Sequence, residues 1–356
     1  MTTYSYDLLK TVSETIFRAA GVPSADAAVV SRMLVDSDLI GVSSHGVQRV
    51  PQYINDIQQG AVKPGAEIQV DRRTPTTSLV NGHWNFGQIV AKCATDEAIT
   101  MACEQGLGSV VVRGCRHVGR LGAYTELCSA EGYIGIAMAS GGNEGHWVAP
   151  FGGREGRLGT NPLAFAAPSA GDPILMDFST SGAPEGKVRL LRDTGQQLSE
   201  PLLVDRAGQY SNDPWDLYEG KSDIRAGAIL PFGGMQGYKS YGLAVMAQIL
   251  AASLGAPIWA SDGIDRFTNG MWLLAIRVES LMNTAAFGVD VQAMVDYIKS
   301  SKPDEGSQGV LIPGDLERRT AKERRVEGIP IDDEIWKNIV NAAKSFGLDP
   351  STMTPS

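Results

Sequence analysis

The sequence predicts a mixed α/β fold, in which both ends of the chain contribute to a helical region beside a central body. Apolar residues recur at helical spacing near each end, and short strand-like runs alternate with helices between them. The 356 residues suggest more than one lobe, and 41 glycines indicate many turns and close backbone approaches. We expect residues 1–75 to pack with C-terminal helices in 290–356, and residues 76–289 to form the mixed α/β body.

Three helices are expected in the first 60 residues. Apolar residues at helical spacing mark the first helix, which Gly21 and Pro23 end. Ser24 is a favourable N-cap for the second helix. The third follows Pro51, because proline is tolerated in the first helical turn, and Gly60 ends it.

In the middle of the chain, the spacing of apolar residues alternates between the patterns typical of strands and of helices. The expected strands are 67–71, 77–81, 109–113, 134–140, 163–167, 173–178 and 271–279. The expected helices are 87–105, 237–254, 289–300 and 332–346. The polar, turn-rich stretch 190–229 is expected to run over the surface, where it could shape a site.

Charge and cysteine content narrow the class of protein. A formal net charge of −9 argues against nucleic acid and anionic membrane as partners, but not against a small anion held by local arginines. The apolar run 241–260 is interrupted by Gly255 and Pro257, so we expect a buried helix and no membrane span. No signal peptide is evident and the four cysteines form no C-x-x-C pair, which predicts reduced thiols in a cytoplasmic protein.

His45 and Arg49 stand four residues apart in a segment that begins at Gly41. Such spacing lets two side chains share a helical face. A guanidinium can hold a carboxylate bidentately, and an imidazole can give a proton to a carbonyl oxygen. The pair therefore suits a substrate whose carboxylate adjoins a carbonyl, while the alternative interpretation is a polar histidine in a turn at a helix start.

His117 directly follows the expected strand 109–113, within a segment rich in glycine and arginine. Positions just past the carboxyl end of a strand are favoured for sites in α/β proteins. The alternative is a basic surface loop. His83 and His146 are interpreted as structural, and no two histidines have metal-ligand spacing, so no metal site is expected.

No G-x-G-x-x-G or P-loop motif occurs in the chain. Glycine-rich segments at 151–154, 158–162 and 231–240 could bring backbone N–H groups near a phosphate, although each could equally be an ordinary turn. In the last segment, Lys239 and Ser240 lie at the start of the expected helix 237–254, where the helix dipole favours an anion.

Several segments, taken together and in order, resemble those of a known family. They are 44–53, 116–124, 150–154, 158–162, 177–181, 231–240 and 312–315. The chain resembles the malate/L-lactate dehydrogenase family of the sulfolactate-dehydrogenase type, over nearly its whole length. That family includes ureidoglycolate dehydrogenase, 2,3-diketogulonate reductase and the piperideine/pyrroline-2-carboxylate reductases.

The resemblance implies a mixed-sheet, sulfolactate-dehydrogenase-like fold that binds NAD or NADP without a Rossmann domain. It also implies a homodimer that interconverts a small 2-oxo acid, or a cyclic 2-imino acid, and its 2-hydroxy or amino acid. The catalytic residues carried over are His45 and His117, and the substrate-binding residues are Ser44, Arg49 and Tyr53. The cofactor-binding residues carried over are Thr160, Asp177, Phe178, Ser179, Thr180, Ser181, Lys239, Ser240, Gly314, Asp315 and Leu316.

The chain also departs from the family pattern. Residues 41–43 replace a segment that often ends in Asp, Cys115 and Arg116 replace a common Ser-Asn pair, and Asp315 replaces a common Glu. Arg116, beside His117, could alter recognition of the distal group of the substrate. Two alternatives therefore stay open, a cofactor-independent acid/base isomerase of a carboxylate and a non-catalytic carboxylate-binding relative. Two further points stay open: whether the cofactor is NAD or NADP, and which of the two histidines transfers the proton.

Overall fold

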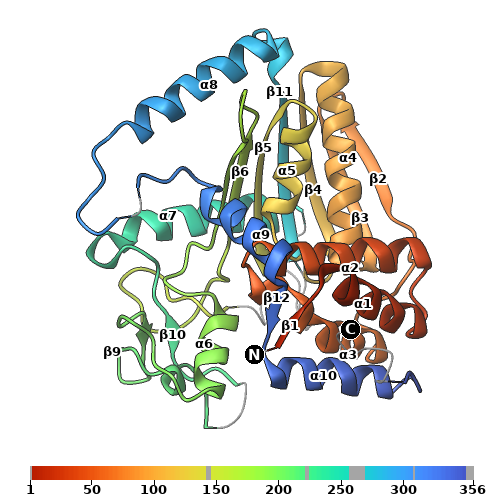
Figure 1. The fold of residues 1–356 in the computed structure, drawn as a ribbon, viewed down its shortest axis with the longest axis vertical. Helices are drawn as coiled ribbons and strands as arrows, with labels where there is room; N and C mark the ends of the chain where they lie inside the picture. Colours follow the sequence, from red (N-terminus) through yellow and green to blue (C-terminus); the bar gives the residue numbers. More distant parts are fainter. Residues whose placement is uncertain (1, 142–145, 221–223, 256–268, 308, 350–356) are drawn as a thin grey trace.

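A seven-stranded mixed sheet forms the centre of the computed structural model, which describes residues 2–141, 146–220, 224–255, 269–307 and 309–349 (Figure 1). The strand order is β2-β3-β4-β11-β5-β6-β7; β3 and β4 pair in parallel and the other neighbours are antiparallel. The strands are β2 (Gln69–Thr74), β3 (Thr77–Asn85), β4 (Leu107–Cys115), β5 (Tyr133–Gly141), β6 (Leu163–Ala167), β7 (Ile174–Phe178) and β11 (Asn269–Arg277). The predicted mixed α/β fold is confirmed.

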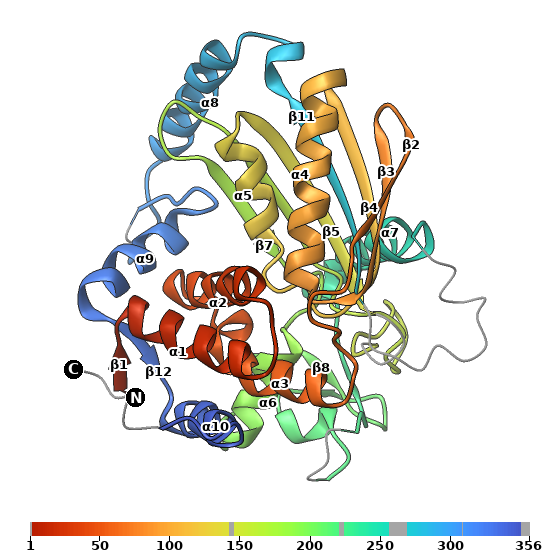
Figure 2. The same ribbon diagram turned by 90° about the vertical axis from the view of Figure 1, so that its right-hand side faces the viewer.

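Helices cover both faces of this sheet. On one face lie α4 (Gly87–Gln105) and α5 (Gly122–Ala130), and on the other lies α7 (Gly237–Ala247) with the π-helical turn Gln248–Ser253 that continues it (Figure 2). A Cβ on Gly270 of β11 would lie 1.9 Å from the carbonyl oxygen of Ala251. Only glycine therefore lets this strand approach the π-helical turn so closely.

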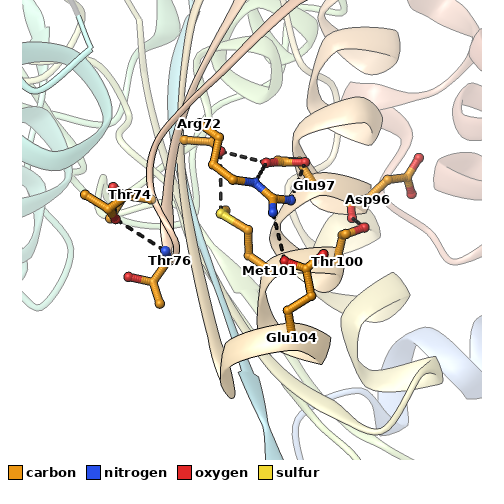
Figure 3. Close-up of polar contacts among 10 residues, drawn as sticks. Arg72, Thr74, Thr76, Asp96, Glu97, Thr100, Met101 and Glu104 are labelled. Carbon is orange, nitrogen blue, oxygen red and sulfur yellow. Dashed lines mark hydrogen bonds and ion pairs between the residues drawn. The ribbon is translucent and has the colours of Figure 1, made fainter.

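The edge strand β2 is tied to helix α4 by charged side chains (Figure 3). Arg72 contacts Glu97 at 2.9 Å and Glu104 at 2.8 Å, and the Ser78 hydroxyl donates to Glu97 at 2.7 Å. Charged residues on an exposed edge discourage pairing with another strand. These contacts fix the outer edge of the sheet.

A helical region adjoins one end of the sheet and draws on both ends of the chain. It comprises β1 (Thr2–Tyr4), α1 (Tyr6–Ala19), α2 (Ser24–Leu39), α3 (Val50–Gln58), β12 (Ile329–Ile331) and α10 (Asp333–Lys344). Buried residues such as Phe17, Leu34 and Ile339 share one hydrophobic core. Helix α8 (Thr284–Lys299) does not belong to this helical region. It lies near the loop after β6, where the Gly288 carbonyl oxygen accepts a hydrogen bond from the Ala170 N–H.

The stretch 190–229, expected to run over the surface, contributes instead to a small folded unit. It includes the end of α6 (Glu185–Asp193), a 3₁₀ turn (Pro214–Leu217) and the three-stranded sheet of β8 (Leu203–Val204), β9 (Tyr210–Ser211) and β10 (Ala228–Ile229). Val188, Leu203, Leu217 and Ile229 are buried in its own core. Many residues of the stretch are exposed, as expected, but its fold around a core was not predicted, because these apolar residues are too widely spaced to give a periodic signal.

Helix α9 (Asp315–Glu327) was not expected. None of its residues is fully buried, so it lacks the apolar stripe that predicts an amphipathic helix from sequence. Among the described residues, no helix is both long and apolar enough to cross a membrane. The run 241–260 is described only as far as residue 255.

Candidate active site

Three adjoining cavities lie at the end of the sheet where β4, β5 and β7 finish. Cavity A, about 430 Å³, is lined by His45, Arg49 and His117 among others. Cavity B, about 350 Å³, shares Ser44, His45, Gly119, Thr160, Pro162 and Pro184 with cavity A. Cavity C, about 290 Å³, adjoins cavity B through β7 and Glu317. His45 therefore lies at the junction of cavities A and B.

The turn that carries His45 and Arg49 rests on a buried carboxyl group. Two 3₁₀ turns, Ser43–His45 and Val47–Arg49, connect α2 to α3. The Val47 N–H donates to Asp38 Oδ2 at 2.7 Å, and a Cβ on Gly46 would lie 2.0 Å from Asp38 Oδ1. Burial raises the pKa of Asp38 to about 7. Gly46 is thus required by this close approach, which fixes the position of the turn.

The partly buried His45 imidazole stacks against His117. The two rings stack with centroids 5.3 Å apart and planes inclined by 16°, and His45 Nδ1 lies 3.0 Å from the Ser44 hydroxyl. Burial, helped by the positive charges of Arg49 and Arg120, lowers the pKa of His45 to about 3. His45 is therefore a neutral imidazole at neutral pH, able to accept a proton.

His117 follows the carboxyl end of β4, as its sequence position predicted. Its Nδ1 lies 2.8 Å from the Tyr53 hydroxyl, which accepts a hydrogen bond from Gln88 Nε2 at 2.7 Å. Burial raises the pKa of Tyr53 to about 12, so its hydroxyl stays protonated and can donate a hydrogen bond to His117 Nδ1. Tyr53 lines none of the three cavities, and its contact orients His117.

Arg49 brings a positive charge into cavity A. It donates to the Ser44 carbonyl oxygen at 2.7 Å and to Gln52 Oε1 at 2.6 Å, and no carboxylate of the described residues pairs with it. Burial lowers its pKa, but a guanidinium stays charged in proteins. Arg116 in the same cavity differs, because it pairs with Asp56 at 2.9 Å. Arg49 is therefore placed to receive an anion.

The residues assigned to the cofactor separate into three groups. Those that line cavity B or C are Thr160, Asp177, Phe178, Ser179, Ser181, Gly314 and Leu316. Those whose polar groups bind the protein itself are Thr180, which donates to the Thr160 carbonyl oxygen, and Asp315, which pairs with Lys299 and Arg318. Lys239 and Ser240 of α7 line none of these cavities, and the Ser240 hydroxyl donates to the Phe232 carbonyl oxygen at 2.6 Å.

Sequence reasoning missed several residues of the site. Asn269, at the start of β11, lines cavity A, and its Oδ1 accepts a hydrogen bond from the Val118 N–H at 3.0 Å. The two residues are 151 positions apart, so no local pattern could join them. Asp38, Gln88 and Glu317 were also missed. Within the part of the chain that the structure describes, no cluster of side chains could hold a metal ion.

Comparison with known proteins gives consistent matches over most of the chain. The model of a family described as malate/L-lactate dehydrogenase matches residues 4–340. The L-sulfolactate dehydrogenase of Methanocaldococcus jannaschii is 34% identical over 339 residues, which cover 94% of each chain. The structure of malate dehydrogenase from Pyrococcus horikoshii is 30% identical, with a TM-score of 0.87 over 98% of this chain and 96% of the other. Delta1-piperideine-2-carboxylate reductase from Pseudomonas syringae is 26% identical, with a TM-score of 0.81 over 96% and 100% of the two chains.

Proposed function

We propose, because the chain belongs to the malate/L-lactate dehydrogenase family, that it uses NAD or NADP to interconvert a small 2-oxo acid and its 2-hydroxy acid. A cyclic 2-imino acid and its amino acid are the second substrate class, which the similarity to a piperideine-2-carboxylate reductase favours. One observation carries the proposal. The partly buried guanidinium of Arg49, which no described carboxylate contacts, lines the same cavity as His45 and His117.

The mechanism assigns one task to each of these groups. The substrate carboxylate pairs with Arg49 in cavity A, because a guanidinium binds a carboxylate in bidentate fashion. His45 takes the hydroxyl proton during oxidation and returns it to the carbonyl oxygen during reduction. His117, whose Nδ1 faces Tyr53, is left with Nε2–H to donate a hydrogen bond to the same oxygen. A nicotinamide held in cavities B and C would supply hydride to, or accept it from, the C2 atom of the substrate.

Cavities B and C fit a nicotinamide nucleotide. Apolar side chains such as Leu175 and Met176 line cavity B and can contact its rings. Asp177 offers an acceptor for ribose hydroxyls. His45, at the junction of cavities A and B, is then the group best placed to exchange a proton where hydride passes between cofactor and substrate.

The proposed function is tested by adding NADH and NADPH to the protein with pyruvate, oxaloacetate, sulfopyruvate, diketogulonate and cyclic imino acids. We expect absorbance at 340 nm to fall with at least one cofactor and one acid. A protein that binds neither cofactor would be better described as an acid/base isomerase of a carboxylate. Binding of cofactor and acid without turnover would instead indicate a non-catalytic relative.

The same assay makes a prediction about pH, because burial lowers the pKa of His45 to about 3. Oxidation needs the neutral imidazole, so its kcat/KM should stay flat between about pH 5 and pH 8. Reduction needs the imidazolium, whose fraction falls tenfold per pH unit above its pKa, so its kcat/KM should fall with a slope near −1. A bend in the oxidation profile near pH 6–7, the range of an unperturbed histidine, would contradict this.

We also propose that two subunits pair and that the enzyme acts in the cytoplasm. Helix α8 supports pairing, since Val289, Met294 and Tyr297 are 62%, 48% and 80% exposed, and large exposed apolar patches often mark protein interfaces. Sedimentation should therefore give twice the mass of one chain, and a monomer at micromolar concentration would exclude stable pairing.

None of the four cysteines forms a disulfide, which fits a reducing compartment.

A further inference from the structure

We infer that this enzyme binds NADH in preference to NADPH, and that Glu317, together with Asp177, sets that preference. The inference rests on the proposed function, because it concerns the cofactor of the same site. NADPH differs from NADH by a 2′-phosphate on the adenosine ribose. The question is therefore whether the cavities that would hold the cofactor favour a hydroxyl or a phosphate at that position.

Carboxylates outnumber cations on the walls of cavities B and C. The acidic residues that line them are Glu126, Asp177 and Glu317, and Asp177 and Glu317 line both cavities. Arg120 is the sole lysine or arginine among the described residues that line them. Its Nη1 lies 3.0 Å from Glu126 Oε1, so its charge is already opposed.

The helix N-termini at these cavities, where phosphates often bind, already hold carboxylates. Helix α5 begins at Gly122, whose N–H donates to Asp177 Oδ2 at 2.7 Å. Helix α9 carries Asp315 and Glu317 in its first turn, and Asp315 Oδ2 accepts a hydrogen bond from the Ile312 N–H at 2.9 Å. Neither helix end therefore offers an open site to a further anion.

The cations just outside cavity C are also paired. Lys299 and Arg318 contact the two oxygens of Asp315 at 2.8 Å and 2.7 Å. Arg318 also lies 3.3 Å from Asp172 and donates to the Pro173 carbonyl oxygen. A 2′-phosphate would have to displace these carboxylates before it could use either charge.

Glu317 is the acidic group best suited to discriminate between the cofactors. No described residue forms a hydrogen bond or ion pair with its carboxylate, whereas Asp177 binds the Gly122 N–H and Glu126 binds Arg120. A carboxylate accepts hydrogen bonds from a ribose diol, which is how acidic residues select NAD in other nicotinamide enzymes. The same carboxylate repels a 2′-phosphate, whose charge is about −1.5 to −2 at neutral pH.

The test is to titrate the wild type and two charge-reversed variants, Glu317→Lys and Glu323→Lys, with NADH and with NADPH. Glu323 lies on the same helix, is exposed and lines neither cavity, so it controls for the change in net charge. Binding is followed by cofactor fluorescence and by thermal shift, which need no substrate. We expect the wild type to bind NADH at least about tenfold more tightly, and Glu317→Lys to move the affinity ratio toward NADPH by about tenfold or more.

Equal or tighter binding of NADPH by the wild type would overturn the inference and leave the proposed function intact. An equal change in the ratio for both lysine variants would overturn the role of Glu317. Binding of neither cofactor by the wild type would refute the proposed function itself, and the inference with it. Should Glu317→Lys fail to fold, Glu317→Gln removes the charge at nearly constant shape and should move the ratio in the same direction by a smaller factor.

Discussion

Replacing His45 by Gln lowers kcat by about 10²–10⁴-fold, the range expected when a general acid or base is removed. Glutamine keeps a polar side chain at the junction of cavities A and B but cannot exchange a proton near neutral pH. Cofactor binding should change little, because the proton is needed only when substrate reacts. The measurements are steady-state kinetics in both directions and a fluorescence titration with the cofactor.

Two matched variants show what the His45 result means. His83→Gln replaces an exposed histidine whose ring contacts the Glu67 carbonyl oxygen, and its kcat should equal that of the wild type. Glutamine can place its amide at the position of only one ring nitrogen, so His117→Gln should lose either the contact with Tyr53 or the hydrogen bond to the substrate oxygen. This loss should cost about tenfold, the value of one net hydrogen bond of about 1–1.5 kcal/mol. A larger loss for His117→Gln than for His45→Gln would move the proton transfer to His117.

The sequence predicted the core of the site because its residues lie close together or at the end of a strand. His45 and Arg49 were expected to share a helical face, and the structure places them on consecutive 3₁₀ turns that still direct both into cavity A. His117 was found from the rule that sites follow strands. What the local pattern could not predict is the support beneath them, such as the contact of Tyr53 with His117, 64 residues further on.

The cavities proposed to hold the cofactor were harder to predict from the sequence, for a physical reason. Residues of β7 and α9 both line cavities B and C. Helix α9 is highly charged and has no buried face, so no hydrophobic pattern in the sequence predicts it. The acidic character of these cavities thus depends on residues whose proximity the fold alone creates. That is why the choice between NAD and NADP stayed open at the level of sequence and can be argued only from the structure.

Arg49 and Arg116 line the same cavity, yet replacing Arg49 by Met should mainly lower activity, and replacing Arg116 by Met should mainly lower stability. Arg49→Met removes a charge that no described carboxylate contacts and that Glu185 and Asp56 attract only at longer range, so the free energy of unfolding should change less than in Arg116→Met. Its kcat/KM should fall by about 30–5000-fold, because losing one partner of a buried charge pair with the substrate costs about 2–5 kcal/mol.

Arg116→Met leaves the buried Asp56 carboxylate without the guanidinium 2.9 Å away. Uncompensated buried charges of this kind cost about 3–5 kcal/mol, so we expect a loss of that size in urea unfolding. Adding Asp56→Asn to the Arg116→Met variant removes the unpaired carboxylate charge and should recover most of the stability. Because Met matches the unbranched stem of Arg, both single variants keep similar packing, and the difference between them isolates the charge. If Arg49→Met were as destabilised as Arg116→Met while its KM for the acid stayed unchanged, Arg49 would be a structural cation, and the carboxylate would have to bind elsewhere.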